Sequence, residues 1–351
     1  MRVHQLLSGA GPVDAVTNQA RAYRACFDAW GWGGGDAAVY VDPRAGRDFV
    51  GVDQLDVAAE DVLLFHYSAY APRLAEQLER PQRKLLVSHN ITPARWFWEY
   101  EAMIAVQCTV GREQLPRFAR AVNLAAGVSA YNAAELDAAG ARDTTVIPIL
   151  FREDRLHREK GDRHLFPTVF FVGRISPHKR HDLLLRAFAL YRAQHAPDAR
   201  LVLVGEPITP AYGAAVRDLA DRLAPGAVEL ASHLSDEALA ERWRAATVFC
   251  CLSEHEGFCI PLLEAFHFGV PVIARGVGGI PEVAGDAALL LDAPELAEVD
   301  VALVAELLHV AATDAELRAE LARRGRERLR AFAHDTTAAK LRDAVERVVM
   351  S

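Results

Sequence analysis

Cysteine is scarce in this chain. Among 351 residues there are five cysteines, an odd number, and their positions lack the spacing of paired metal ligands. Most of them lie in apolar stretches, so we expect reduced, buried thiols rather than a disulfide framework or a metal site. This usage favours a cytoplasmic protein. The cysteines are Cys26, Cys108, Cys250, Cys251 and Cys259.

Long apolar runs are also missing. A membrane-spanning helix needs about 18 or more consecutive apolar residues, and no stretch of this sequence reaches that length. The first apolar run, Met1 to Leu7, is shorter than the apolar core of a signal peptide. We therefore expect neither a spanning helix nor a signal peptide. Peripheral contact with the inner face of a membrane stays open.

The chain has no excess of positive charge. Its 39 lysines and arginines are outnumbered by 47 acidic residues, which gives a net charge of −8. Nucleic-acid binders take their affinity mainly from basic residues on phosphates, so we expect no nucleic-acid partner. The 51% hydrophobic and 25% charged residues are typical of a globular protein, and the length suggests two domains.

One stretch has the pattern of a strand, a turn, a helix and a second strand. The apolar run Val248 to Leu252 ends abruptly in the polar segment Ser253 to Gly257. Pro261 suits the first turn of a helix, and Gly269 would end that helix before the strand Val270 to Ala274. Strands buried on both faces belong to parallel sheets, which bind ligands at their carboxyl edge. The sequence therefore predicts a ligand-binding turn here.

Two glutamates flank this turn. Backbone N–H groups around Gly257, Phe258 and the helix start would suit a phosphate, and Glu256 and Glu264 could accept hydrogen bonds from sugar hydroxyls. A nucleotide sugar supplies both kinds of group. Taken without this context, two glutamates are more often ordinary solvated surface residues.

The run from Ser253 to Ala265, SEHEGFCIPLLEA, resembles the signature of retaining glycosyltransferases of family 4. The resemblance implies an α/β protein of the GT-B fold, with two Rossmann-like βαβ domains facing each other across a cleft. It also implies that Glu256 lies near the donor sugar and Glu264 near the ribose. Many family members have glycine where this chain has Cys259.

The resemblance further implies a reaction. A hexose-like sugar would move from a nucleotide-diphosphate sugar, such as a UDP-, GDP- or dTDP-sugar, to an acceptor hydroxyl with retention at the anomeric carbon. The acceptor would be a glycan, a lipid-linked molecule or a small natural product. No cofactor and no metal are expected, and the pattern leaves the oligomeric state unknown.

A basic loop follows the strand predicted from Thr168 to Val172. Arg174 and Lys179, five residues apart, could direct two cations at a diphosphate, since arginine offers a fork and lysine a point charge. The family holds its donor diphosphate with this pair, and Gly173 would let the backbone approach. Without the resemblance, such a loop is most often ordinary solvent-exposed surface. A helix is expected from His181 to Gln194.

The first half of the chain begins with a short strand and a loop from Ser8 to Asp14. Gly9 and Gly11 would permit a tight turn and a close approach to a ligand, although the third glycine of a dinucleotide fingerprint is absent. A plain strand–helix turn is about as well supported by the residues alone. The family places a glycine-bearing loop here, and Asp14 would then meet the acceptor or the donor.

Two later strands end in polar clusters. They are predicted from Asp61 to Ser68 and from Lys84 to Asn90, with His66 and His89 at their carboxyl ends. A lone histidine is more often structural than catalytic, and that is our interpretation of His66. The segment around His89 resembles one in some family members, which place a histidine or aspartate near the reacting sugar carbon. With Arg174, Lys179 and Glu256, His89 completes the expected catalytic set.

The expected domains are residues 1–155, binding the acceptor, and residues 165–335, binding the nucleotide sugar, with a linker at 152–163. A final helix at 336–351 would return to the first domain, and a continuous helix is expected from Ala94 to Val122. The remaining residues expected to bind the donor do so near the turn or, for the base, through backbone groups at a strand end. They are Gly257, Phe258, Cys259, Leu262, Leu263, Ser232, His233 and Leu234.

Two alternatives remain. A sugar-nucleotide epimerase or hydrolase on the same fold would turn over without an acceptor. A non-catalytic nucleotide-sugar-binding partner would bind without any turnover.

Overall fold

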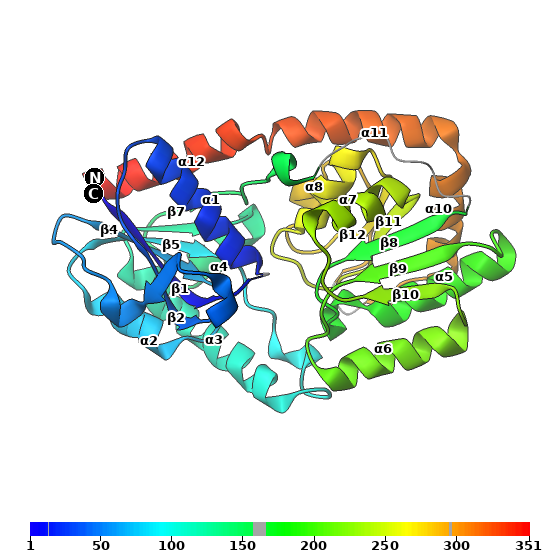
Figure 1. The fold of residues 1–351 in the computed structure, drawn as a ribbon, viewed down its shortest axis with the longest axis horizontal. Helices are drawn as coiled ribbons and strands as arrows, with labels where there is room; N and C mark the ends of the chain where they lie inside the picture. The colour runs from blue at the N-terminus through cyan, green and yellow to red at the C-terminus, as the bar shows by residue number, and fades with distance from the viewer. Residues whose placement is uncertain (13, 157–165, 295–296) are drawn as a thin grey trace. The chain divides into compact units, whose positions relative to one another are not determined.

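The computed structural model describes residues 1–12, 14–156, 166–294 and 297–351 (Figure 1). From residue 157 onward the predicted linker lies outside these ranges. The chain divides into two compact units. The first comprises Met1–Trp98, Ala102–Leu150 and Phe332–Ser351, and the second comprises Glu99–Glu101 and Phe151–Ala331. The last segment of the chain therefore belongs to the first unit.

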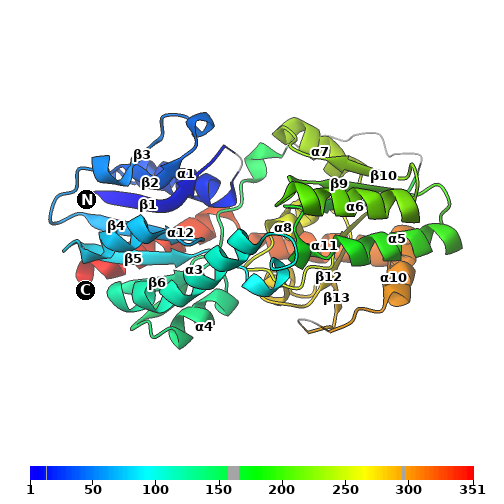
Figure 2. The same ribbon diagram turned by 90° about the horizontal axis from the view of Figure 1, so that it is seen from below.

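The first unit contains a seven-stranded parallel sheet in the order β3-β2-β1-β4-β5-β6-β7 (Figure 2). Its strands are short and rich in apolar residues, as expected for strands buried on both faces. They are β1 (Val3–Ala10), β2 (Asp36–Val41), β3 (Phe49–Gly51), β4 (Val62–Tyr67), β5 (Arg83–Ser88), β6 (Leu124–Gly127) and β7 (Thr144–Val146).

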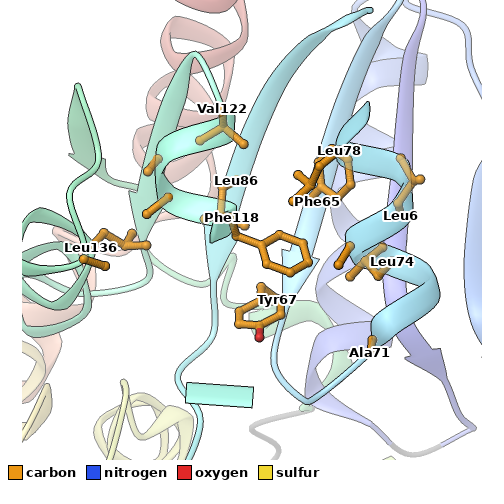
Figure 3. Packing of buried hydrophobic residues seen from close by; sticks show 14 of the residues in the cluster. Leu6, Phe65, Tyr67, Ala71, Leu74, Leu78, Leu86, Phe118, Val122 and Leu136 are labelled. Carbon is orange, nitrogen blue, oxygen red and sulfur yellow. The ribbon is translucent and has the colours of Figure 1, made fainter. Parts of the chain in front are cut away.

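The helices of the first unit cover both faces of this sheet. Side chains alternate along a strand, so Leu6 joins one buried cluster and Leu7 another. In the first cluster, Phe118 packs against Tyr67 with ring centroids 4.2 Å apart (Figure 3). The helices are α1 (Ala15–Ala29), α2 (Pro72–Glu76), α3 (Ala102–Ala121), α4 (Ala130–Ala138) and α12 (His334–Met350), with 3-10 turns η1 (Pro43–Ala45), η2 (Val52–Gln54), η3 (Gln77–Glu79) and η4 (Ala94–Trp96).

One predicted helix is interrupted. Residues 94–122 were expected to form a continuous helix, but η4 ends at Trp96 and α3 begins only at Ala102. Residues 99–101, between them, belong to the second unit. The apolar and polar spacing of this segment fits a helix and does not account for the break.

The second unit contains a six-stranded parallel sheet in the order β10-β9-β8-β11-β12-β13. Its strands are β8 (Thr168–Val172), β9 (Arg200–Val204), β10 (Val228–Ala231), β11 (Val248–Cys251), β12 (Val272–Arg275) and β13 (Leu289–Leu291). Its helices are α5 (His181–Gln194), α6 (Pro210–Leu223), α7 (Asp236–Ala245), α8 (Ile260–Phe268), α9 (Ile280–Ala284), α10 (Val301–Thr313) and α11 (Ala315–Arg330), with turns η5 (Glu153–Arg155) and η6 (Pro177–Lys179).

Each sheet has a point where the strand order reverses. In the first unit the chain runs outward from β1 through β2 and β3, then returns to pair β4 with the other side of β1. In the second unit β8 is flanked in the same way by β9 and β11. Ligands of open parallel sheets bind outside the carboxyl ends of the two strands at such a point. The loops after β1, β4, β8 and β11 are therefore the places to examine.

No helix within the described ranges combines the length and the apolar character that crossing a bilayer would require.

Candidate functional site

The loops after β8 and β11 meet at the carboxyl edge of the second sheet. The backbone N–H of Glu254 donates to the carbonyl oxygen of His178 at 2.8 Å, which joins the two loops directly. Beside this contact, Lys179 Nζ lies 2.5 Å from Glu256 Oε1. Two residues predicted separately from two motifs are thus paired in the folded protein.

The Lys179–Glu256 pair is largely shielded from water. Burial by itself lowers the pKa of the Lys179 ammonium, but the charge of Glu256 and the neighbouring thiols of Cys251 and Cys259 outweigh it, so the pKa is raised. Lys179 therefore remains a cation at neutral pH. A fixed cation at a water-poor strand edge stabilises negative charge more strongly than one in bulk water.

Arg174 lies in the same loop, two residues after β8. It is exposed, and none of the described residues accepts a hydrogen bond from its guanidinium. Gly173 has φ +149°, a conformation that side chains other than glycine rarely adopt. A Cβ on Gly205 would lie 2.0 Å from the Gly173 carbonyl oxygen, so the glycine at position 205 lets the ends of β8 and β9 approach.

Glu264 is on α8, eight residues beyond Glu256. Trp243 of α7 donates its indole N–H to Glu264 Oε2 at 3.1 Å, which fixes the carboxyl group. Burial raises the pKa of Glu264 to about 7, although the Trp243 hydrogen bond opposes this. Leu262 and Leu263, on the same helix, are fully buried, so their role in binding the donor remains a prediction.

Cys259 caps the start of α8 in an unusual conformation. Its φ is +75°, in the left-handed region that favours glycine. This explains why a glycine is common at the matching position in the family that the sequence resembles. The thiol side chain is accommodated here and is buried. Gly257 and Phe258 precede it, and Phe258 is buried too.

Three side chains in this loop have atoms that can bind a metal. Cys251, Glu256 and Cys259 are buried, and their ligand atoms lie within 4.8 Å of one another. The Lys179 ammonium already contacts Glu256, so a cation is built into the cluster. A metal ion would have to displace that ammonium. The donor set is thus compatible with a thiophilic metal but is electrostatically satisfied without one.

Sequence reasoning missed a buried charge network that holds this loop. Arg275 is fully buried and donates to Glu254 Oε1 at 3.2 Å. Arg180 donates to the same oxygen at 2.5 Å. Residue 275 was expected in a loop after a strand at 270–274, but β12 extends through Arg275. In the sequence, the charged residues around Glu254 indicate that charges gather here, but they do not show which residues pair with Glu254.

The glycine loop after β12 also supports the turn. The N–H of Gly279 donates to the carbonyl oxygen of Glu256 at 2.9 Å. Gly278 has φ +57°, and a Cβ there would lie 2.1 Å from that same oxygen. The backbone of Glu256 is therefore fixed by close contact with this loop.

In the first unit, the predicted histidine lies where β5 ends. His89 is half-buried, and its Nε2 is 2.9 Å from Nδ1 of the fully buried His66. Burial lowers the pKa of His89 to about 4, although nearby Asp14 opposes this, so the imidazole is neutral at pH 7. His66 has partners on both ring nitrogens, as expected of a structural histidine, and one of these partners is His89.

The loop after β1 differs from its prediction. β1 extends to Ala10, so Gly9 lies in the strand, and neither Gly9 nor Gly11 has a positive φ. These glycines are therefore not needed for a left-handed backbone conformation; the chain turns at Pro12, and residue 13 of the predicted loop lies outside the described ranges. Asp14 caps α1 by accepting hydrogen bonds from Thr17 N at 2.8 Å and Thr17 Oγ1 at 2.9 Å.

The residues expected to recognise the base lie at the carboxyl end of β10. That strand ends at Ala231, so Ser232 and His233 follow it, and both are exposed, whereas Leu234 is half-buried. They are on the far side of β9 from β8. Their backbone groups are accessible, and a role in binding remains a prediction.

Curated proteins match part of this chain. The chain is 37% identical over 124 residues to a D-inositol 3-phosphate glycosyltransferase of Mycobacteroides abscessus. The aligned region covers 34% of this chain and 26% of that protein. It is 39% identical over 124 residues to an alpha-maltose-1-phosphate synthase of Mycolicibacterium smegmatis, covering 34% and 31%. The matched region thus spans only about a quarter to a third of these curated relatives.

Solved structures resemble the fold over nearly its whole length. A sucrose-phosphate synthase from Thermosynechococcus elongatus has a TM-score of 0.76 at 18% identity, covering 99% of this chain and 98% of that one. Anabaena HepE, solved with UDP and glucose, has a TM-score of 0.75 at 15% identity, covering 99% of both. The predicted GT-B fold class is confirmed.

The site residues of the second unit fall within one family match. Residues 153–328, half of the chain, match the family described as glycosyl transferases group 1. The matched region includes β8, β11, α8 and the Lys179–Glu256 pair. The chain belongs to the glycosyl transferases group 1 family.

Proposed function

We propose that this protein transfers a hexose-like sugar from a nucleotide-diphosphate sugar to an acceptor hydroxyl, with retention and without a metal. The observation that carries the proposal is the Lys179–Glu256 ion pair at the carboxyl edge of β8 and β11. It combines a cation suited to the diphosphate with a carboxylate suited to sugar hydroxyls. The exposed Arg174 guanidinium adds a second cation for the same diphosphate.

The comparisons support the donor class. HepE was solved with UDP-glucose and with UDP, and its fold matches this chain. The curated relatives are named as a glycosyltransferase and a sugar-phosphate synthase. The acceptor class remains a glycan, a lipid-linked molecule or a small natural product, because acceptor-binding loops differ most between relatives.

The direct test is a screen of purified protein against UDP-, GDP- and dTDP-sugars, with mass spectrometry of the released nucleotide. Slow hydrolysis of one sugar nucleotide, accelerated by an acceptor, would support transfer. Complete turnover without any acceptor would identify a hydrolase or epimerase instead. Binding of a nucleotide sugar without turnover would identify a non-catalytic partner.

Donor affinity should depend on pH through Glu264. Its pKa of about 7 is above the ordinary value of about 4.3, so the free protein binds a proton there as pH falls through 7. Ribose hydroxyls donate to the ionised carboxylate, so Kd for the nucleotide sugar should rise by about tenfold per pH unit well below pH 7.

Glu264→Gln provides the control for this pH effect. The variant should bind more weakly at pH 8 and should show no change in Kd between pH 6 and pH 8, as measured by calorimetry. Nucleotide sugars suit this measurement because their phosphates are diesters and do not titrate in this range. Equal affinity of variant and parent at pH 8 would remove Glu264 from the binding site.

The product should keep the anomeric configuration of the donor. An inverting enzyme needs a base opposite the leaving group, and His89 is our candidate for that position in the first unit. We instead expect His89 to hydrogen-bond a sugar hydroxyl, so His89→Ala should lower turnover without abolishing it. Proton NMR of the anomeric coupling decides: a β-linked product from an α-linked donor, lost entirely in His89→Ala, would show that His89 is the base.

A further inference from the structure

A chain of buried polar side chains leads to His89 from the interior of the first unit. His89 Nε2 is 2.9 Å from His66 Nδ1, and His66 Nε2 is 2.8 Å from Oε1 of Gln5. Gln5 and His66 are both fully buried. Gln5 is on β1 and His66 on β4, the two strands at the reversal point of the sheet.

The Gln5 amide can have only one orientation. Its Nε2 lies 2.9 Å from the backbone oxygen of Ala20 and 2.9 Å from Asp36 Oδ1, and these two oxygens can only accept. Asp36 also forms an ion pair with Arg24, whose Nη2 is 2.7 Å from the same Oδ1. The amide oxygen of Gln5 must therefore face His66.

This orientation determines where His66 holds its proton. An amide oxygen only accepts, so His66 donates through Nε2. Burial and then the neighbouring His89 hold the pKa of His66 well below its usual range, so the ring is neutral and has one proton. Its Nδ1 is consequently a lone pair, which requires His89 to donate its Nε2–H.

The protonation of His66 also determines which nitrogen of His89 is protonated. A neutral His89 that has its proton on Nε2 has a bare Nδ1. Within the described part of the chain, no residue hydrogen-bonds to that nitrogen. His89 is half-buried at the carboxyl end of β5, next to β4. This nitrogen can accept a hydrogen bond from an O–H group but cannot donate to a phosphate oxygen.

We propose that Gln5 and His66 are positioning residues that hold His89 in the tautomer protonated on Nε2, so that Nδ1 accepts a hydrogen bond from a hydroxyl group of the donor sugar. The choice of the donor sugar rests on the proposed function, whereas the tautomer rests on the hydrogen-bond chain alone. Removing the second partner of a metal-binding histidine typically costs about 10- to 100-fold in metal affinity or activity, and we expect the lower end of this range here.

The tautomer can be measured without any substrate. In protein labelled with ¹⁵N in its histidine rings, long-range proton–nitrogen spectra report which ring nitrogen is protonated, and His89→Asn identifies the His89 signals. At pH 7 we expect a bare Nδ1 and a protonated Nε2. A proton on Nδ1, or on both nitrogens, overturns the proposal. If the wild type turns over no sugar nucleotide, the proposed function fails, and this spectrum still decides the tautomer.

Two substitutions of His66 test the positioning role. Glutamine can accept from His89 through its oxygen and donate to Gln5 through its nitrogen, whereas leucine can do neither. We expect His66→Leu to lower kcat for the donor by about tenfold and to give His89 mixed tautomers. His66→Gln should stay within about threefold of the wild type and keep the tautomer.

The outcomes of these variants are separable from loss of folding. Thermal unfolding and circular dichroism show whether each variant folds. Full turnover in His66→Leu overturns the positioning role. The positioning role is also overturned if both variants lose turnover equally while His89 keeps its tautomer in His66→Gln. In that case a glutamine that preserves the hydrogen-bond directions would not rescue activity.

Discussion

Replacing Arg174 with alanine should lower kcat by about 100-fold or more while leaving the protein folded. The guanidinium is exposed and no described residue accepts a hydrogen bond from it, so its removal leaves no buried group unpaired. Its proposed target is the departing diphosphate, whose charge grows as the glycosidic bond breaks. Loss of a donor that acts mainly in the transition state appears in kcat rather than in KM.

Arg186→Ala is the matched control for this prediction. Arg186 is an exposed arginine on α5, in the same unit, and its replacement by alanine changes the net charge by the same amount. It should keep wild-type kcat, which separates a local effect from a general loss of positive charge. Turnover that is unchanged in Arg174→Ala, measured with the best donor from the screen, would end the assignment of Arg174 to the diphosphate.

The parts of the fold set by local chemistry were predictable from the sequence. The helix at His181–Gln194 has the expected bounds, and α8 ends at Phe268 because Gly269 adopts φ +68° there. Pro261 lies in the first turn of α8, as its missing N–H suggested. The pairing of Lys179 with Glu256 was not predictable from spacing, since 77 residues separate them.

The polar contacts that position these groups could not be predicted, for one physical reason. Gln5 and His66 are 61 residues apart, and Gln5 and Asp36 are 31 apart. Each reads as an isolated polar residue in or beside an apolar strand. Only the pairing of β1 with β2 and β4 brings them together. Residue types predict which side chains need hydrogen-bond partners, whereas the strand order determines which residues become those partners.

The same limit applies to Arg275, which directly follows the strand predicted to end at Ala274. In the structure it is fully buried, and Nε donates to the Ala293 oxygen at 2.7 Å while Nη2 donates to the Ala297 oxygen at 2.9 Å. Nη1 donates to Glu254, two residues before Glu256. The guanidinium thereby connects the end of β12 to the loop that contains Glu256.

Arg275→Ala should lower the free energy of unfolding by about 3–5 kcal/mol, because it leaves the buried Glu254 carboxylate with less compensation. Arg242→Ala is the matched control: Arg242 also pairs with a glutamate, Glu229, at 2.6 Å, but Glu229 is exposed and Arg242 is partly exposed, so the loss should be at most about 1 kcal/mol. Urea denaturation at one pH measures both variants.

The double variant Arg275→Met with Glu254→Gln distinguishes an unpaired charge from a lost packing contact. Removing the carboxylate's charge together with its partner should restore part of the stability, since the cost of a broken buried pair comes mainly from the charge left behind. A double variant as unstable as the sum of its single variants would show that Arg275 stabilises the loop through its backbone carbonyl contacts instead. In that case Glu254 would depend on Arg180, which donates to it from the loop after β8.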